Sequence, residues 1–452
     1  ELKQGVAYKL QLERYFKGTK VATVMMQPVT TLSAVNMKST SIQSNEVVYA
    51  KPKTAIVQFD KLVSKVEATL AQIDGDKKEP IKVEASVKDK AVTVTWPNDL
   101  ARQKTYQLAL TKVEATDGSN LVEPVTIPFK TSGGPLVKSI SVGTHKVPLG
   151  AVATLTFDQP LSDKQDIGSV ITVSGGAKVT SRQGARVTIS FAGTPRCGDV
   201  TIKVTNGLLS SYDISGGSSW QYTTRTICQV ISSIGTSLNG RVISTYSFGS
   251  GAKTIVYTGA IHGDESGTRS LMLRWVDTLE ASVRSIPADK TIVVIPAINP
   301  DGVAAGTRTN KHNVDLNRNF DTSDWKEDIT TVSNQPFPGG GGSAPLSEPE
   351  SQALANYIGM VKPALVLSYH SIGGLVMSNQ SGNSLSLAQT YARLSGYANS
   401  TGSSTTFDYA VSGTADDYYA EKLGVASILV ELGSHTSPQF EQNQKAMWAM
   451  MQ

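Results

Sequence analysis

Short runs in which apolar and polar residues alternate fill the first half of the chain. Residues 54–59, 91–96 and 106–110 are such runs, and Gly, Pro, Asn and Asp separate them. Alternation with a period of two is typical of strands that bury one face, and closely spaced strands without helical stretches favour antiparallel sandwiches. The first half is therefore predicted to be all-β.

The pattern occurs twice, because residues 55–60 resemble residues 153–158, and residues 91–96 resemble residues 186–191. Both copies are similar to the immunoglobulin-like modules of bacterial secreted proteins, so we predict two tandem sandwiches. An N-terminal segment precedes them and is either an extra layer of strands or a stalk. The predicted boundaries are 1–45 for this segment, 46–132 and 134–225 for the sandwiches, and 227–452 for a last domain.

From about residue 227 the pattern changes to near-continuous apolar runs, which are typical of strands covered on both faces. Between the runs, Leu271, Trp275 and Leu279 are spaced as on one face of a helix, and Ser347 and Glu350 form a capping-box pattern before another. The last domain is therefore predicted to be α/β, with a mixed central sheet flanked by helices. The apolar runs are 253–258, 291–295, 364–369 and 426–430.

Composition and charge narrow the classes of function. Charged residues make up 18% of the chain and the net charge of +4 is small, with Lys and Arg scattered, so nucleic acid is not an expected partner. No run of 18 apolar residues occurs, so no transmembrane segment is predicted. Cys197 and Cys228 either form a disulfide, which suits an extracytoplasmic compartment, or stay as two buried thiols.

Candidate chemistry lies at the ends of the predicted buried strands. His262 and Glu265 follow one strand, and His370 ends another. Ligands of open α/β sheets bind at the carboxyl ends of strands, and two His with one Glu are a ligand set of hydrolytic zinc sites. Glu431 closes a third buried strand, where a carboxylate is suited to act as a general base.

Several motifs of the last domain, taken in order, resemble the zinc carboxypeptidase family, which includes the pancreatic carboxypeptidases A and B and bacterial murein-peptide hydrolases. The resemblance covers roughly residues 227–452. The matching positions are 259–265, 299–302, 308, 314–320, 347–350, 369–371 and 430–432.

The resemblance implies one Zn²⁺ per chain, bound by His262, Glu265 and His370. It implies that Glu431 acts as the general base that activates water and then donates the proton to the leaving amine. It also implies that Arg308 polarises the scissile carbonyl and stabilises the oxyanion.

The same resemblance assigns residues to substrate binding. Asn317 and Arg318 are expected to hold the terminal carboxylate, and Tyr409 resembles the mobile tyrosine that caps the substrate. Asp416 aligns with the floor of the specificity pocket, where the family places an acid when it releases a basic residue. One of Asp416 and Asp417 is alternatively an acid that serves only the N-terminus of a helix.

Three further polar residues receive other interpretations. Asp315 is expected to support the site from behind the metal ligands rather than to act on substrate. His312 and His435 match no motif of the family and are expected at the surface or at the rim of the pocket.

These observations predict a zinc metallocarboxypeptidase that hydrolyses the C-terminal amide bond of peptides. Peptidoglycan stem peptide is the expected substrate, with diaminopimelate or a basic residue released. We expect a monomer that is secreted, periplasmic or held on a bacterial surface. The alternatives are a carboxypeptidase of broad extracellular specificity, an N-acyl amino acid deacylase, and a non-catalytic wall-binding protein, which the complete set of site residues disfavours.

Overall fold

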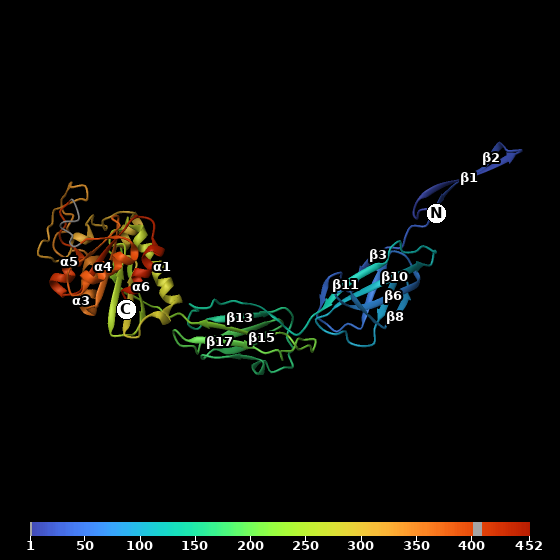
Figure 1. Ribbon diagram of the computed structural model, residues 1–452, viewed down its shortest axis with the longest axis horizontal. Coiled ribbons are helices and arrows are strands. Elements are labelled where there is room, and N and C mark those ends of the chain that lie inside the picture. The colour runs from blue at the N-terminus through green and yellow to red at the C-terminus, as the bar shows by residue number, and fades with distance from the viewer. Residues whose placement is uncertain (1, 401–408) are drawn as a thin grey trace. The chain divides into compact units, whose positions relative to one another are not determined.

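The computed structural model describes residues 2–400 and 409–452 and divides the chain into two compact units (Figure 1). The first unit begins with β1 (Ala7–Phe16) and β2 (Thr19–Thr30), which pair antiparallel in a two-stranded sheet. Among the described side chains of this hairpin most are exposed. Its alternating pattern therefore forms strands without burying a face.

Two sheets enclose the first sandwich core, in which Val57 and Leu108 are fully buried. The sandwich begins earlier than the predicted boundary at residue 46, because Val35 and Ile42 are buried in the same core. An immunoglobulin-like topology stays a prediction. The sheets are β3 (Met37–Thr40), β5 (Thr54–Phe59), β9 (Ala91–Thr95) and β8 (Glu84–Lys88), and β4 (Glu46–Val48), β11 (Val125–Thr131), β10 (Thr105–Ala115), β6 (Val63–Asp74) and β7 (Lys77–Ile81).

The second repeat also forms two sheets, of four and three strands. Their inward positions alternate as predicted, with Leu155, Ile189 and Ile202 fully buried. The sheets are β12 (Val137–Ile140), β13 (Val152–Phe157), β16 (Arg186–Ser190) and β15 (Lys178–Gln183), and β14 (Ile171–Val173), β17 (Asp199–Val204) and β18 (Trp220–Arg225), with the short helix η1 (Ile167–Ser169) before β14.

The second unit contains residues 224–452 with the loops 143–149 and 194–199, and its centre is an eight-stranded mixed sheet. The four middle strands, β22, β21, β25 and β28, are parallel, and β20 and β26 flank them antiparallel. The predicted mixed sheet is confirmed. In order, the strands are β19 (Val230–Thr236), β20 (Val242–Gly249), β22 (Lys290–Ile295), β21 (Lys253–Thr258), β25 (Leu365–Ser371), β28 (Ser427–Leu432), β26 (Leu375–Ser378) and β27 (Ala398–Asn399).

Helices cover both faces of this sheet, which explains the continuous apolar runs. On one face, α1, α4 and α6 pack against alternate strand residues such as Tyr257 and Tyr369. On the other face, α3 and α5 pack against Val256 and Val366. The helices of this unit are α1 (Ser266–Ala281), η2 (Val283–Ser285), α2 (Pro300–Ala305), η3 (Leu316–Arg318), α3 (Pro349–Val361), α4 (Ser384–Ser395), α5 (Ala415–Tyr418), η5 (Tyr419–Leu423) and α6 (Phe440–Ala449), and β23 (Ile329–Thr330) pairs with β24 (Pro336–Phe337).

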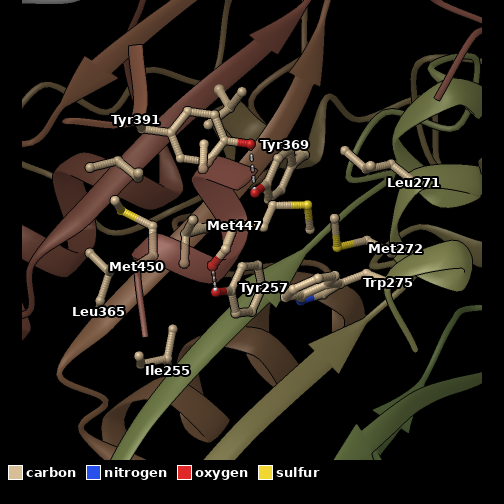
Figure 2. Close-up of a cluster of buried hydrophobic side chains, with 14 of the residues drawn as sticks. Ile255, Tyr257, Leu271, Met272, Trp275, Leu365, Tyr369, Tyr391, Met447 and Met450 are labelled. Carbon is tan, nitrogen blue, oxygen red and sulfur yellow. Dashed lines mark hydrogen bonds between the residues drawn. The ribbon is translucent and has the colours of Figure 1, made fainter. Parts of the chain in front are cut away.

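Buried tyrosine hydroxyls tie the larger core together (Figure 2). Tyr257 donates a hydrogen bond to the Met447 carbonyl at 2.8 Å, and the Tyr369 and Tyr391 hydroxyls lie 3.1 Å apart. A buried hydroxyl without a partner costs free energy, so these bonds allow large aromatic rings to fill the core between the sheet and its helices. They also hold β21 and β25, the strands that lead to the predicted metal ligands.

The capping box predicted at Ser347 and Glu350 is wrong. The helix begins at Pro349, and Ser347 donates its hydroxyl to Glu348 instead of capping the helix. Glu350 is fully buried and accepts hydrogen bonds from the Leu238 backbone and from Asn310. Tertiary partners outcompete the local cap because they satisfy the buried carboxylate directly.

No helix within residues 2–400 and 409–452 combines the length and apolar composition needed to cross a membrane.

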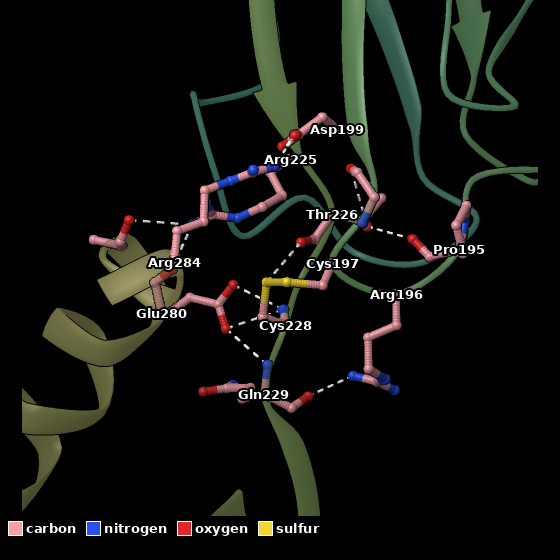
Figure 3. Close-up of a disulfide and its surroundings, with 12 residues drawn as sticks. Pro195, Arg196, Cys197, Asp199, Arg225, Thr226, Cys228, Gln229, Glu280 and Arg284 are labelled. Carbon is pink, nitrogen blue, oxygen red and sulfur yellow. Dashed lines mark hydrogen bonds and ion pairs between the residues drawn. A yellow bond between two sulfur atoms is a disulfide. The ribbon is translucent and has the colours of Figure 1, made fainter. Parts of the chain in front are cut away.

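A disulfide between Cys197 and Cys228 lies where β19 is about to begin (Figure 3). The buried Glu280 carboxylate, at the end of α1, accepts hydrogen bonds from the backbone N–H groups of Cys228 and Gln229, each at 2.8 Å. The bond and the carboxylate together fasten the chain to α1 just before the sheet starts. Of the two states left open for these cysteines, the structure has the disulfide.

We predict that the Cys197→Ser, Cys228→Ser double variant unfolds more easily. The disulfide closes a loop of 31 residues, and the loss of such a constraint costs about 2–4 kcal/mol. Scanning calorimetry should show the lower transition temperature, and reductant should lower the wild-type transition without moving that of the variant. A variant as stable as the oxidised wild type would contradict the prediction.

Candidate metal and substrate site

Three side chains converge where the parallel strands end. His262, Glu265 and His370 are buried, and their ligand atoms all lie within 4.8 Å of one another. The Nδ1 atoms of the two histidines are 3.3 Å apart, and His262 Nδ1 is 2.8 Å from Glu265 Oε1. Two imidazoles and one carboxylate that point at one place are the donor set of a catalytic zinc site.

The turn between β21 and α1 brings His262 and Glu265 together. Thr268 closes this turn, because its hydroxyl donates to the Glu265 carbonyl at 2.8 Å and accepts from the Ala260 N–H at 2.9 Å. A Cβ on Gly263 would lie 2.0 Å from the Gly302 carbonyl carbon, so the turn requires glycine at that position. His370 comes from β25, the strand next to β21 in the sheet.

Asp315 shows that the three residues fit a metal ion. Its Oδ1 lies 3.0 Å from His262 Nε2, and a proton held on Nε2 by this carboxylate leaves the Nδ1 lone pair for a ligand bond. Burial lowers the pKa of His370, and the positive charges of His262 and Arg308 lower it further, so this imidazole is neutral. At His262 burial acts in the same direction, but Glu265 and Asp315 raise the pKa, so a metal ion that binds there has to displace a proton from this imidazole.

The second oxygen of Asp315 holds Arg308. Arg308 Nε donates to Asp315 Oδ2 at 2.9 Å, and its Nη1 lies 3.6 Å from Glu265 Oε1. Burial alone would raise the pKa of Asp315, but Arg308 and His262 hold it well below the ordinary value of an aspartate. The Arg308 side chain is 28% exposed, so its guanidinium faces the cavity while Asp315 fixes it from behind.

Strand register places Glu431 beside the ligands. Glu431 of β28 is directly opposite His370 of β25, and it is buried. Burial, reinforced by the negative charge of Glu265, raises the pKa of Glu431 to about 8. A Cβ on Gly373 would lie 3.0 Å from the Glu431 Cβ, so a larger residue there would press on this carboxylate.

All nine residues predicted for the site line one cavity of about 310 Å³. They come from segments spread over 170 residues of the chain, and the cavity opens at the carboxyl ends of the parallel strands. They are His262, Glu265, Arg308, Asn317, Arg318, His370, Tyr409, Asp416 and Glu431.

The Arg318 guanidinium is held between polar and aromatic groups. Its Nη1 donates to the Asn317 carbonyl at 2.7 Å, and its centre lies 6.0 Å from the centre of the Tyr409 ring. Its Nε is buried without a hydrogen-bond partner in the part of the chain that the structure describes. The Asn317 side chain accepts from the Ala415 N–H at 3.0 Å, which ties η3 to the start of α5.

The two neighbouring acids of α5 have different surroundings. Asp417 forms a capping pair with Thr414, whose hydroxyl donates to the Asp417 carboxylate at 2.6 Å and accepts from the Asp417 N–H. Asp416 faces the cavity, and its Oδ1 accepts from the Ser368 hydroxyl at 3.2 Å. Its Oδ2 is buried without a hydrogen-bond partner among the described residues. Both side chains line the cavity, and Asp417 is the one whose carboxylate is already paired at the start of the helix.

Burial raises the pKa of Asp416 to about 6, and the adjacent Asp417 adds to the effect. Met377, Asn379 and Leu429 line the same cavity as Asp416. A buried carboxylate with one unpaired oxygen is a strong acceptor for a cationic group.

The expectation that His312 and His435 lie at the surface or at the rim of the pocket is confirmed, because both are exposed. His435 lines the cavity, with its Nδ1 2.9 Å from the Ser371 hydroxyl, whereas His312 binds Glu348 through Nδ1 at 2.9 Å and lies outside the cavity. No motif marks His435, and the one available signal was its position four residues after Glu431.

Comparisons with known proteins agree with this geometry. The sequence profile described as zinc carboxypeptidase matches residues 223–449, half of the chain. Murein peptide amidase A of Escherichia coli is 37% identical over 116 residues, covering 24% of this chain and 45% of the amidase. Gamma-D-glutamyl-L-diamino acid endopeptidase 1 of Lysinibacillus sphaericus is 24% identical over 249 residues, covering 45% of this chain and 61% of the endopeptidase. The chain thus spans less than two thirds of either relative.

Solved structures show the same kind of likeness. The murein-tripeptide amidase of Escherichia coli O157 matches with a TM-score of 0.39 and 24% identity, covering 49% of this chain and 91% of the amidase.

Proposed function

Because the chain belongs to the zinc carboxypeptidase family, we propose that it hydrolyses peptidoglycan stem peptides at the amide bond that precedes a diaminopimelate or other basic terminal residue. The observation that carries this proposal is Asp416, a buried acid in the same cavity as His262, Glu265, His370 and Glu431. The two curated relatives named above are a murein peptide amidase and a γ-D-glutamyl-diamino acid endopeptidase, which supports the same choice of substrate.

The chain's own residues divide the chemistry of such a reaction. Zinc held by His262, Glu265 and His370 supplies Lewis acidity, which lowers the pKa of water and polarises a carbonyl. The raised pKa of Glu431 would fall beside the charge of a bound zinc ion, and the ionised carboxylate accepts the proton of the attacking water and passes it to the leaving amine. Arg308 stabilises the negative charge that develops on the carbonyl oxygen. Since Asp315 already fixes the guanidinium, little reorganisation is needed as this charge forms.

The released residue is recognised at its two charged ends. Arg318 and Asn317 bind its terminal carboxylate, for which Arg318 has an unpaired buried N–H, and Tyr409 covers it from the side. Asp416 binds the side-chain ammonium. Diaminopimelate, lysine and ornithine all carry both groups, whereas an apolar residue leaves the Asp416 carboxylate unpaired.

We also propose a location outside the cytoplasm. The Cys197–Cys228 disulfide is compatible with an oxidising compartment, and the proposed substrate is found there.

The proposed reaction predicts that the zinc-loaded protein releases diaminopimelate from L-Ala-γ-D-Glu-meso-diaminopimelate, detected by liquid chromatography and mass spectrometry. Glu431→Gln should lower kcat by about 10²–10⁴-fold, because the proton-transfer group is lost while the metal ligands remain. Zinc affinity should be unchanged.

Glu350→Gln is the matched control, since Glu350 is a buried acid outside the cavity, and it should keep the activity. Cleavage of N-acyl amino acids in preference to the tripeptide would instead identify a deacylase. Full activity of Glu431→Gln would contradict the mechanism.

Asp416 predicts a pH-dependent preference for a cationic residue. Between peptides that end in Lys or in its uncharged isostere norleucine, the ratio of kcat/KM should favour Lys above pH 6 and fall as the pH drops through about 6. The reason is that the Asp416 carboxylate, with its pKa raised to about 6, is ionised above this value and neutral below it.

Asp416→Asn should reduce this ratio at least tenfold and remove its pH dependence, while Asp417→Asn, whose carboxylate is already paired with Thr414, should change the ratio much less. The ratio cancels differences in the amount of active enzyme. A preference for Lys that survives in Asp416→Asn would show that another group binds the ammonium.

A further inference from the structure

His435 is a cavity residue that the proposed mechanism does not use. It lies in the loop between β28 and α6, and its imidazole Nδ1 is 2.9 Å from the Ser371 hydroxyl. The loop is anchored beside the metal ligands, because the His435 carbonyl accepts a hydrogen bond from the Gly267 N–H, two residues after Glu265. Both its backbone and its side chain are thus held at the reacting end of the cavity.

The contacts of successive β25 residues show where Asp416 and His435 lie relative to the metal ligand His370. Ser368 contacts Asp416, His370 is a metal ligand, and Ser371 contacts His435. Strand residues advance about 3.3 Å each and their side chains alternate between faces, so positions 368 and 371 lie about 10 Å apart along the strand and on opposite faces of it. Along β25, Asp416 therefore contacts a residue before His370, and His435 contacts a residue after it.

This order assigns the two ends of the cavity to different substrate residues. A peptide whose released side chain binds Asp416, with its scissile carbonyl at the metal ligands, has its preceding residue on the side of His435. The residue that remains in the acyl product is therefore the one near His435. Asp264, Glu431 and Arg308 are further charged residues that line the cavity.

The contact with the Ser371 hydroxyl bears on which His435 nitrogen can donate a hydrogen bond. When this hydroxyl donates to Nδ1, the neutral imidazole carries its proton on Nε2, and Nε2 is a hydrogen-bond donor. A donor held in one orientation suits an acceptor on the preceding residue of the substrate. A carboxylate is the strongest such acceptor, because charge-assisted hydrogen bonds are about twice as strong as neutral ones.

A γ-linked glutamyl residue has a carboxylate at this position. Its side-chain carboxyl forms the scissile amide, so its α-carboxylate stays free next to the bond that is cleaved, whereas an α-linked residue has used this group. We propose that His435 donates a hydrogen bond from Nε2 to this α-carboxylate and thereby selects γ-glutamyl substrates. The inference rests on the proposed function and adds a specificity residue for the acyl side of the bond.

The test compares two substrates that differ at one group. L-Ala-γ-D-Glu-meso-diaminopimelate has the free α-carboxylate, and L-Ala-γ-D-isoglutaminyl-meso-diaminopimelate has an amide in its place. His435→Ala should lower kcat/KM at least tenfold on the free acid and less than twofold on the amide. His435→Gln, whose side-chain amide can donate from the position of Nε2, should recover most of the loss.

The ratio of kcat/KM on the free acid to kcat/KM on the amide, measured for one variant, does not depend on how much of that variant is folded. His312→Ala is the matched control, since that imidazole lies outside the cavity, and its ratio should equal the wild-type ratio. An equal loss on both substrates, or no loss, in His435→Ala would overturn the inference alone. Wild-type protein that cleaves neither tripeptide would overturn the proposed function and the inference with it.

Discussion

The site depends on the two contacts that the Asp315 carboxylate makes. One oxygen binds His262 and so sets the proton of a metal ligand, and the other binds Arg308. Removal of one partner from a buried charged pair typically costs 3–5 kcal/mol, because the remaining charge stays buried without compensation. A single carboxylate therefore couples the histidine that binds the metal to the guanidinium assigned to the oxyanion. If either His262 or Arg308 moved away, the Asp315 carboxylate would lose one of its two partners.

The sheet supplies the second constraint. Glu431 pairs with His370 across β28 and β25, and a slip of one residue in this pairing would turn Glu431 to the opposite face. The parallel register, fixed by apolar cores on both faces, thus sets the distance between the proposed base and the ligands. The large buried core thus positions the small polar cavity, because the hydrophobic packing of the strands determines where their last residues lie.

The sequence predicted those parts of the structure that depend on pattern along one strand or on a motif. The four buried strands and the ligands that follow them were found, because covered strands have continuous apolar composition and the ligands lie at their ends. Features that depend on contacts between distant segments were not found. Ser347 and Glu350 matched a capping box, yet Ser347 accepts a hydrogen bond from Asn319 and Glu350 accepts one from Leu238, both distant in the sequence. The neighbours of His435 became visible only when its loop was placed against Ser371.

The two acids of α5 show the same limit. Asp416 and Asp417 are adjacent in the sequence and both line the cavity, and only the position of Thr414 shows that Asp417 is the one that pairs at the start of the helix. The first sandwich began earlier than predicted for a related reason, since Val35 and Ile42 join a core formed by residues far along the chain. Local pattern identifies strands and helices well, but it does not tell which of them share a core.

The central claim is that His262, Glu265 and His370 form one metal site at the carboxyl edge of the sheet. Calorimetric titration of the metal-free protein with Zn²⁺ tests it most directly. The account predicts saturable binding of one ion per chain, a higher unfolding temperature for the domain that contains the site, and loss of both effects in His370→Ala. Binding that is absent from the wild type, or that persists unchanged in His370→Ala, would contradict it.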